Sequence, residues 1–333
     1  MELRNDRTPM TPDGRSAPHI INGSKTVLGI NGMKVWKVVG SGSYGTVVLY
    51  RSSNKQVAVK SMVCKTEREK IDAQQEVKAL KLFGSCPFVI NFLADVVDKD
   101  MHHVAMDAAQ KDFSDIIETL TARKAKQYFK QFISGVLFMH QLRYAHRDLK
   151  TPNLLLGSDG NLKICDFNMA VPFITVAGEQ LLYAGNCGTE EYHPPEMFLK
   201  EKKDQYCPRA YDIWSCGVIF AEFFSGDLPW EAAKGTDTTY SNFIGGQRLG
   251  KMTKPQDGFL RFMCVECATD RPSIEEISNH PFLRDRSRAL LTQKAARAPL
   301  APASVNTPAV IGRKRKLDIT PVAAKRRNLR ATS

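Results

Sequence analysis

The sequence lacks any long uninterrupted apolar run. Its best apolar stretch, Ile213 to Phe224, contains Ser215 and Glu222 and is too short to cross a bilayer. The first 24 residues contain no apolar core of signal-peptide length. We therefore expect a soluble, intracellular protein with no membrane partner.

Cysteines are not clustered either. The eight cysteines are dispersed, which favours a reduced compartment. One close pair, Cys264 and Cys267, has no second pair at zinc-ligand spacing. The expectation is two buried helix cysteines, not a metal or redox site.

Basic charge is in excess, and it is confined to one end of the chain. The sequence holds 47 Lys+Arg against 35 Asp+Glu, a net charge of +12. Residues 284–333 carry thirteen basic and two acidic side chains, and residues 1–31 carry four and three, which leaves 32–283 neutral. A neutral body argues against a nucleic-acid-binding core and makes the basic tail a separate element. The tail also has no interleaved aromatics for base stacking, so nucleic-acid binding is the weaker alternative.

The two ends have the composition of disordered segments. Residues 1–31 contain Thr8-Pro9, Thr11-Pro12 and scattered Gly and Asn without apolar periodicity. Residues 298–312 have a similar composition, with Ala and Pro. We expect a disordered segment over 1–31, a folded domain over 32–283 and a largely disordered tail over 284–333.

Strand patterns come first in the folded domain and helical patterns follow. Val-rich alternation predicts strands, and apolar residues at helical spacing predict helices. The order suggests an α+β fold of two lobes with a cleft between them, the first over about 32–106 and the second over about 110–283. The expected strands are Met33 to Tyr50, Gln56 to Met62 and His103 to Met106; the expected helices are Ile71 to Phe83, Arg123 to His140, Tyr211 to Phe224, Gly258 to Cys267 and Ile274 to Asn279.

A glycine-rich stretch joins two of the strand patterns. It reads Gly40-Ser41-Gly42-Ser43-Tyr44-Gly45-Thr46-Val47. Such glycines let a hairpin backbone close over phosphate oxygens. A plain hairpin turn is the alternative, and a Rossmann site is disfavoured because a strand follows the third glycine.

A lysine and a glutamate that could form an ion pair follow the glycine-rich stretch. Lys60 ends the apolar strand Val57-Ala58-Val59-Lys60, and Glu76 lies on the predicted helix from Ile71. An ion pair with Glu76 would hold the flexible lysine against the α- and β-phosphates of a nucleotide. Each residue alone could equally be an exposed charge.

The next segment is more specific. His146-Arg147-Asp148-Leu149-Lys150-Thr151-Pro152-Asn153 matches the catalytic loop of protein kinases, and Asp166-Phe167 follows. Gly188-Thr189, Pro194-Pro195-Glu196, Asp212-Ile213-Trp214-Ser215 and Asp270-Arg271-Pro272 continue in the family order. The sequence thus resembles the eukaryotic protein kinase family over about 33–283, which implies the bilobal protein kinase fold.

The resemblance implies ATP and Mg²⁺ as cofactors and assigns roles to residues. Asp148 would orient the substrate hydroxyl and accept its proton, while Asn153 and Asp166 would bind Mg²⁺. Glu196 would pair with Arg271, and Asp212 would brace the catalytic loop. The adenine would contact Ala58, Leu155, the gatekeeper Met106 and the backbone of Asp107 and Ala109, and the glycine-rich segment through Val47 would cover the phosphates.

The resemblance also indicates the serine/threonine branch. Lys150, two residues after Asp148, would help neutralise the transferred phosphoryl group, and Thr189 would position the substrate. Asp166-Phe167-Asn168 departs from the usual Asp-Phe-Gly. Because Asn tolerates left-handed backbone angles, we expect an active enzyme with a slower outward flip of Phe167; the alternative is a catalytically weak pseudokinase or scaffold.

Arg147, next to Asp148, should be an unpaired cation until an anion arrives. In related kinases that anion is a phosphate on the activation segment, which here would run from Asp166 to Glu196. Regulation by phosphorylation is therefore expected. The segment offers the hydroxyls of Thr175, Tyr183, Thr189 and Tyr192, and because the resemblance gives Thr189 a role with the substrate, Thr175 is the candidate site.

The tail carries two basic clusters. Arg313-Lys314 and Lys325-Arg326-Arg327 are separated by ten residues, which resembles a bipartite nuclear localisation signal for an import receptor. Arg315-Lys316-Leu317-Asp318-Ile319 resembles a MAP-kinase docking peptide, and a solvated charge run is the alternative. Thr320-Pro321 lies inside the spacer, so phosphorylation there by a proline-directed kinase would weaken nuclear accumulation.

Overall fold

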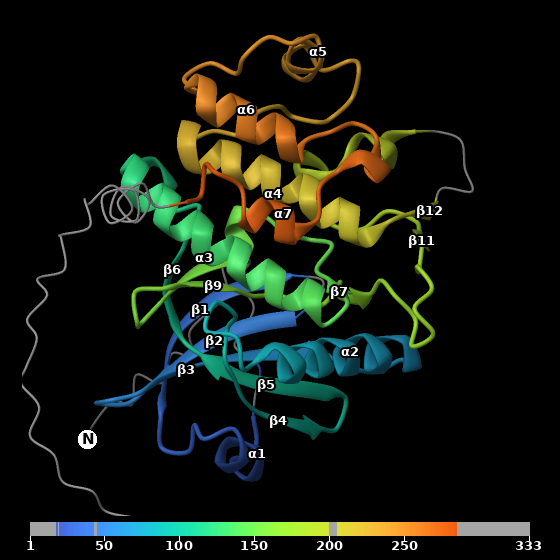
Figure 1. Ribbon diagram of the computed structural model, residues 1–333. Coiled ribbons are helices and arrows are strands. Elements are labelled where there is room, and N and C mark those ends of the chain that lie inside the picture. Colours follow the sequence, from blue (N-terminus) through green and yellow to red (C-terminus); the bar gives the residue numbers. More distant parts are fainter. Residues whose placement is uncertain (1–17, 19, 43–44, 200–204, 285–333) are drawn as a thin grey trace, which may run out of the picture. The chain divides into compact units, whose positions relative to one another are not determined.

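The computed structural model describes residues 18, 20–42, 45–199 and 205–284. The chain divides into two units, 1–284 and 285–333, and the second lies wholly outside the described residues, as do Ser43 and Tyr44. The expected α+β bilobal fold is confirmed in the first unit, where Figure 1 shows a sheet with one long helix followed by a helical part.

The small lobe is built on a five-stranded antiparallel sheet in the order β1-β2-β3-β5-β4. Its strands are β1 (Lys34–Gly42), β2 (Gly45–Arg51), β3 (Gln56–Val63), β4 (Phe92–Asp98) and β5 (Met101–Asp107). Helix α2 (Glu67–Phe83) begins four residues before the predicted start, because Thr66 and Glu69 form a capping box that satisfies its first N–H groups.

The expectation of disorder up to residue 31 is wrong for residues 20–31. This stretch contains α1 (Asn22–Val27), and Ile20, Leu28 and Ile30 are buried in a core with side chains from β1, β2, β3 and β5. Since α2 belongs to the other core cluster, this N-terminal cap packs on a separate part of the small lobe, and Figure 1 shows α1 and α2 on opposite sides of the sheet. The sequence did not indicate the burial of these three apolar residues, because the segment around them is mostly polar.

The large lobe is helical. Its helices are α3 (Ala122–Gln141), α4 (Pro208–Ser225), α5 (Thr238–Ile244), α6 (Lys254–Met263) and α7 (Ile274–Ser278). This lobe also contains short strands, which are β6 (Ala109–Asp112), β7 (Tyr144–Ala145), β8 (Leu154–Gly157), β9 (Leu162–Ile164), β10 (Val171–Pro172), β11 (Tyr183–Ala184) and β12 (Gln205–Tyr206). Single 3₁₀ turns lie at Ile117–Thr119, Thr151–Asn153, Glu190–Tyr192, Pro195–Phe198 and Ala268–Asp270.

One predicted helix ends early. Helix α6 stops at Met263, and beyond its end Arg271 donates to the carbonyls of Val265 at 2.8 Å and Glu266 at 2.9 Å. Cys264 is buried at the end of this helix, but Cys267 is exposed beyond it, so the expectation of two buried helix cysteines is wrong for Cys267.

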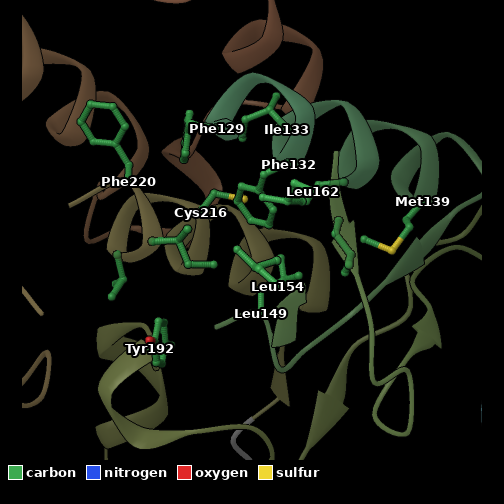
Figure 2. Packing of buried hydrophobic residues seen from close by; sticks show 14 of the residues in the cluster. Phe129, Phe132, Ile133, Met139, Leu149, Leu154, Leu162, Tyr192, Cys216 and Phe220 are labelled. Carbon is green, nitrogen blue, oxygen red and sulfur yellow. The ribbon is translucent and has the colours of Figure 1, made fainter. Parts of the chain in front are cut away.

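A large apolar core lies beneath the predicted catalytic loop. Leu149 and Leu154 are fully buried, and Figure 2 shows them in one cluster with Phe132 of α3 and Cys216 of α4. The loop is therefore anchored on both sides of Asn153 by buried leucines. In the part of the chain that the structure describes, no helix is long and apolar enough to cross a membrane.

Candidate active site

The catalytic loop is fixed from below by a buried carboxylate. Asp212, on α4, accepts hydrogen bonds from the backbone N–H of His146 and of Arg147, each at 2.8 Å. His140 of α3 lies 2.9 Å from the same carboxylate. These bonds hold the backbone at Arg147 in the left-handed region, with φ of 66°, immediately before Asp148.

Lys60 joins two predicted site residues. Its Nζ lies 2.7 Å from Oε1 of Glu76 and 2.8 Å from Oδ1 of Asp166. Burial acts to lower the pKa of Lys60, but the two carboxylates outweigh it and hold that pKa above its ordinary value. Burial acts to raise the pKa of Asp166, and the Lys60 ammonium overcomes it, so that pKa lies below its ordinary value. Lys60 and Asp166 therefore favour their charged forms, whereas burial outweighs the Lys60 ammonium at Glu76 and raises the pKa of that carboxyl.

Asp148 lies in a second cluster with Lys150 and Thr189. Thr189 Oγ1 donates to Asp148 Oδ1 at 2.8 Å, and Lys150 Nζ lies 2.9 Å from Asp148 Oδ2. Lys150 Nζ also donates to Thr189 Oγ1 at 2.7 Å. Asn153 Nδ2 donates to the backbone oxygen of Asp148 at 2.8 Å. The structure thus brings together four predicted residues that lie up to 41 positions apart.

The predicted nucleotide-binding residues that the structure describes lie on β1, β2, β3 and β5 of the small-lobe sheet and on β6 and β8. Gly40 pairs with Val47 and Gly42 with Gly45 across β1 and β2, and Val47 in turn pairs with Lys60 on β3.

The predicted adenine contacts are placed by the same pairing. Ala58 lies opposite Met106 on β5, and Leu155 lies on β8, which pairs with β6. Ala109 begins β6, so Asp107 and Ala109 bracket the link between the lobes. The N–H of Asp107 donates to Asn91 O at 3.1 Å.

The left-handed backbone that the sequence suggested for Asn168 is found two residues earlier, at Asp166, with φ of 65°. Asn168 therefore carries no backbone penalty in this arrangement. Phe167 is fully buried, packing 5.1 Å from the ring of Phe83 and 5.1 Å from that of His146. Oδ1 of Asn168 is buried without a hydrogen-bond partner among the described residues.

Arg147 has neutral contacts that the sequence did not predict. Its Nε donates to Met169 O and its Nη1 to the hydroxyl of Tyr206, both at 2.8 Å. Its guanidinium carbon lies 5.0 Å from the ring centroid of Tyr183. Neither tyrosine was predicted to contact Arg147, because nothing in the sequence around them indicates such a contact.

The Glu196–Arg271 pair is present. Arg271 Nη1 lies 2.7 Å from Oε1 of Glu196, and Nη2 lies 2.5 Å from Oε2. This two-pronged contact ties the end of the activation segment to the region after α6.

A buried carboxylate on α4 also went unpredicted. Glu222 accepts hydrogen bonds from Tyr192 at 2.8 Å and from Thr151 at 3.1 Å. Burial raises the pKa of Glu222 to about 7, although the two hydroxyls oppose this. The one signal in the sequence was the presence of a glutamate inside the most apolar predicted helix. The helix pattern located Glu222 but gave no reason for a carboxylate at that position.

The comparisons with known proteins agree with this geometry. The protein kinase domain family matches residues 33–283. The chain is 30% identical over 220 residues to serine/threonine-protein kinase grp of Drosophila melanogaster, covering 64% of this chain and 42% of the relative. It is 30% identical over 269 residues to probable serine/threonine-protein kinase MARK-C of Dictyostelium discoideum, covering 77% and 34%.

A plant relative gives the same result. The chain is 30% identical over 271 residues to CBL-interacting serine/threonine-protein kinase 13 of Arabidopsis thaliana, covering 75% of this chain and 51% of that protein. The chain thus spans about half or less of the length of these relatives. The match over three quarters of its residues shows that this chain belongs to the protein kinase domain family.

Proposed function

We propose that this chain is a serine/threonine protein kinase that transfers the γ-phosphoryl group of ATP to protein hydroxyls. The observation that carries the proposal is the hydroxyl of Thr189 bonded to Asp148 at 2.8 Å and to Lys150 at 2.7 Å. A substrate hydroxyl at this position would meet a carboxylate that accepts its proton and an ammonium beside it. The names of the kinase relatives support the serine/threonine assignment.

The glycine-rich hairpin supports ATP as the phosphoryl donor. A Cβ added at Gly40 or Gly42 would meet no atom within 4 Å, and neither glycine has a positive φ. Internal packing therefore does not require these two glycines, whereas a ligand passing close to the backbone would. Gly45 differs, because a Cβ there would lie 2.5 Å from Ser61 O.

The donor set supports Mg²⁺. The carboxylate of Asp166 and the amide oxygen of Asn153 are hard oxygen ligands of the kind this ion prefers. Within 20–42, 45–199 and 205–284, no group of three or more His, Cys, Asp or Glu is arranged to hold a metal. Two protein ligands suit an ion whose remaining positions are filled by water and nucleotide phosphates. Bound there, Mg²⁺–ATP would supply the phosphoryl group, and the ion would neutralise part of its negative charge.

The protein's own groups would act by position and charge. Asp148 would hold the substrate hydroxyl and accept its proton at a carboxylate oxygen. Lys150 would stabilise negative charge on the moving phosphoryl group, and Lys60, held by Glu76, would fix the α- and β-phosphates.

A peptide-array phosphorylation assay tests the proposal, because it reports activity, residue type and sequence preference together. We expect serine and threonine peptides to be labelled and Asp148→Asn to lower the rate about 10²- to 10⁴-fold, as for loss of a general base. Glu118→Gln, at an exposed glutamate, is the matched control. ATP binding without transfer to any peptide or to the chain itself would favour the scaffold alternative that Asn168 raises.

For the tail we propose nuclear import through Arg313-Lys314 and Lys325-Arg326-Arg327, opposed by phosphorylation of Thr320. The support is the spacing of the two clusters and the Thr320-Pro321 pair between them. A phosphate would add one to two negative charges among cations that an acidic receptor groove would bind. The MAP-kinase docking peptide at Arg315 to Ile319 would bring the proline-directed kinase to that site.

Two experiments test the tail. Residues 310–333 fused to a cytoplasmic reporter should carry it into the nucleus, and a reporter that stays outside would refute the signal. In the full chain, Thr320→Glu should shift the protein outward relative to Thr320→Ala. Identical distributions of the two variants would remove the switch.

A further inference from the structure

The surroundings of Arg147 point beyond the proposed function, on which this inference rests. Arg147 precedes the predicted base Asp148, and its side chain makes three contacts, with Met169 O, Tyr206 and Tyr183. Over the described ranges, no carboxylate forms an ion pair with it. The charge is instead held by one backbone carbonyl, one phenol hydroxyl and one aromatic face.

The two tyrosines lie opposite each other on one ribbon. Strands β11 and β12 pair antiparallel, with Tyr183 in register with Tyr206. Tyr206 is 5% exposed, its hydroxyl lies 2.9 Å from Sγ of Cys187, and its ring packs 5.8 Å from that of Tyr211. The ribbon thus reaches Arg147 with a hydroxyl that is already held in place.

Tyr183 is anchored toward the catalytic loop. Its hydroxyl donates to Pro172 O at 2.8 Å. Pro172 lies on β10, which pairs with β7 at Tyr144, two residues before His146. The activation segment is therefore bound to the chain before the catalytic loop and, through Arg147, to the loop itself.

Physical chemistry explains why this arrangement can hold a charge. Arginine over an aromatic ring is attracted to its face, and a hydrogen bond from a charged donor is stronger than one between neutral groups. Burial raises the pKa of Tyr206, so its hydroxyl stays neutral and can accept from Nη1. In related kinases a phosphate holds the corresponding arginine. Here the two tyrosines contact Arg147 instead, but they carry no negative charge.

The candidate phosphosite is engaged elsewhere. Thr175 Oγ1 accepts from the N–H of Glu179 at 3.0 Å, within a turn closed by Ile174 and Gln180. In the part of the chain with described positions, Thr175 makes no contact with Arg147.

We propose that Tyr206 and Tyr183 clamp Arg147, and that this clamp aligns the catalytic loop with the activation segment without a phosphate. Tyr206 is then a positioning residue that acts on the reaction through Arg147. The chain in its unmodified form should be fully active.

The first test compares phosphorylation states of the full chain. Protein treated with phosphatase, and shown by intact mass to carry no phosphate, should keep its kcat within about twofold. A loss of tenfold or more that returns on rephosphorylation would overturn the clamp. Failure of every form to transfer phosphate to any peptide would instead refute the proposed function.

The second test removes only the hydroxyl. Tyr206→Phe should lower kcat roughly ten- to a hundredfold with little change in KM for ATP, as for loss of a hydrogen bond to a charged group. Tyr50→Phe, at a 3% exposed tyrosine of β2, is the matched control and should change neither. In the Arg147→Ala background, Tyr206→Phe should have no further effect, because the residue acts through Arg147. Multiplying effects would contradict the proposal.

A third measurement does not depend on activity. Hydrogen exchange of residues 181–187 should rise in Tyr206→Phe and in Arg147→Ala by the same amount, and no further in the double variant. Unchanged exchange in Tyr206→Phe would overturn the clamp even if the chain proves inactive.

Discussion

Nζ of Lys60 lies 2.8 Å from Oδ1 of Asp166, a residue 106 positions further along the chain. The same ammonium contacts Glu76 of α2 at 2.7 Å. One cation therefore joins the small-lobe sheet, helix α2 and the segment after β9. This contact determines whether the residues predicted to bind the nucleotide and those predicted to bind the metal lie close together.

Lys60→Met should lower kcat about a hundredfold, because it removes a preorganised cation from the transferring phosphates. It also leaves the carboxylate of Glu76 buried without its partner, so the melting temperature should fall. Lys81→Met, at a half-exposed lysine of α2, is the control and should retain activity. Phosphorylation rates and melting curves measure both effects, and a Lys60→Met rate above a tenth of wild type would contradict the assignment.

Asn168→Gly should change kcat by less than about fivefold. The backbone at 168 is outside the left-handed region, and the predicted metal ligand Asp166 is already beside Lys60. A Mg²⁺-dependent kinase assay of the two proteins measures this. A hundredfold gain on restoring glycine would show that Asn168 makes the natural chain catalytically weak.

Glu222→Gln should change how stability depends on pH. The pKa of Glu222 in the folded chain is about 7, above the value near 4.3 of an unfolded glutamate. Between these values the folded state binds the extra proton, so this group's contribution to the free energy of unfolding falls as pH rises toward 7.

The wild-type chain should therefore lose stability relative to Glu222→Gln between pH 5 and pH 8, by on the order of 2 kcal/mol. Glutamine keeps an acceptor for Tyr192 and Thr151 but cannot ionise. Melting temperatures of both proteins across this range measure the difference, with Glu118→Gln as the exposed control. Parallel curves for wild type and Glu222→Gln would show that this carboxyl does not titrate there.

Leu28→Ala should lower the free energy of unfolding by about 2–5 kcal/mol, since it empties a buried site in the N-terminal cap. Leu28 is 1% exposed, whereas its neighbour Val27 is 55% exposed. Val27→Ala is therefore a matched control, expected to change stability by less than about 0.5 kcal/mol. Urea unfolding measures both, and equal small effects would mean that residues 20–31 do not contribute to the folded lobe.

The sequence by itself determined the features that act over short distances along the chain. Asp148, Lys150 and Asn153 lie within six residues, so one motif brings the predicted base, cation and metal ligand together. Helix and strand patterns located most elements, because periodicity needs only neighbouring residues. The resemblance to the protein kinase family rests on these local patterns.

The tertiary structure decided the contacts between distant residues. Tyr206 reaches Arg147 across 59 positions, and Glu222 reaches Thr151 across 71. Neither partner is marked by its neighbours, because a hydroxyl or a carboxylate acquires its role only from what folding places beside it. The same holds for Ile20, Leu28 and Ile30, whose burial depends on a sheet formed later in the chain. Apolar periodicity could not reveal them, since three apolar residues in a polar segment have no pattern until the sheet supplies the opposing surface.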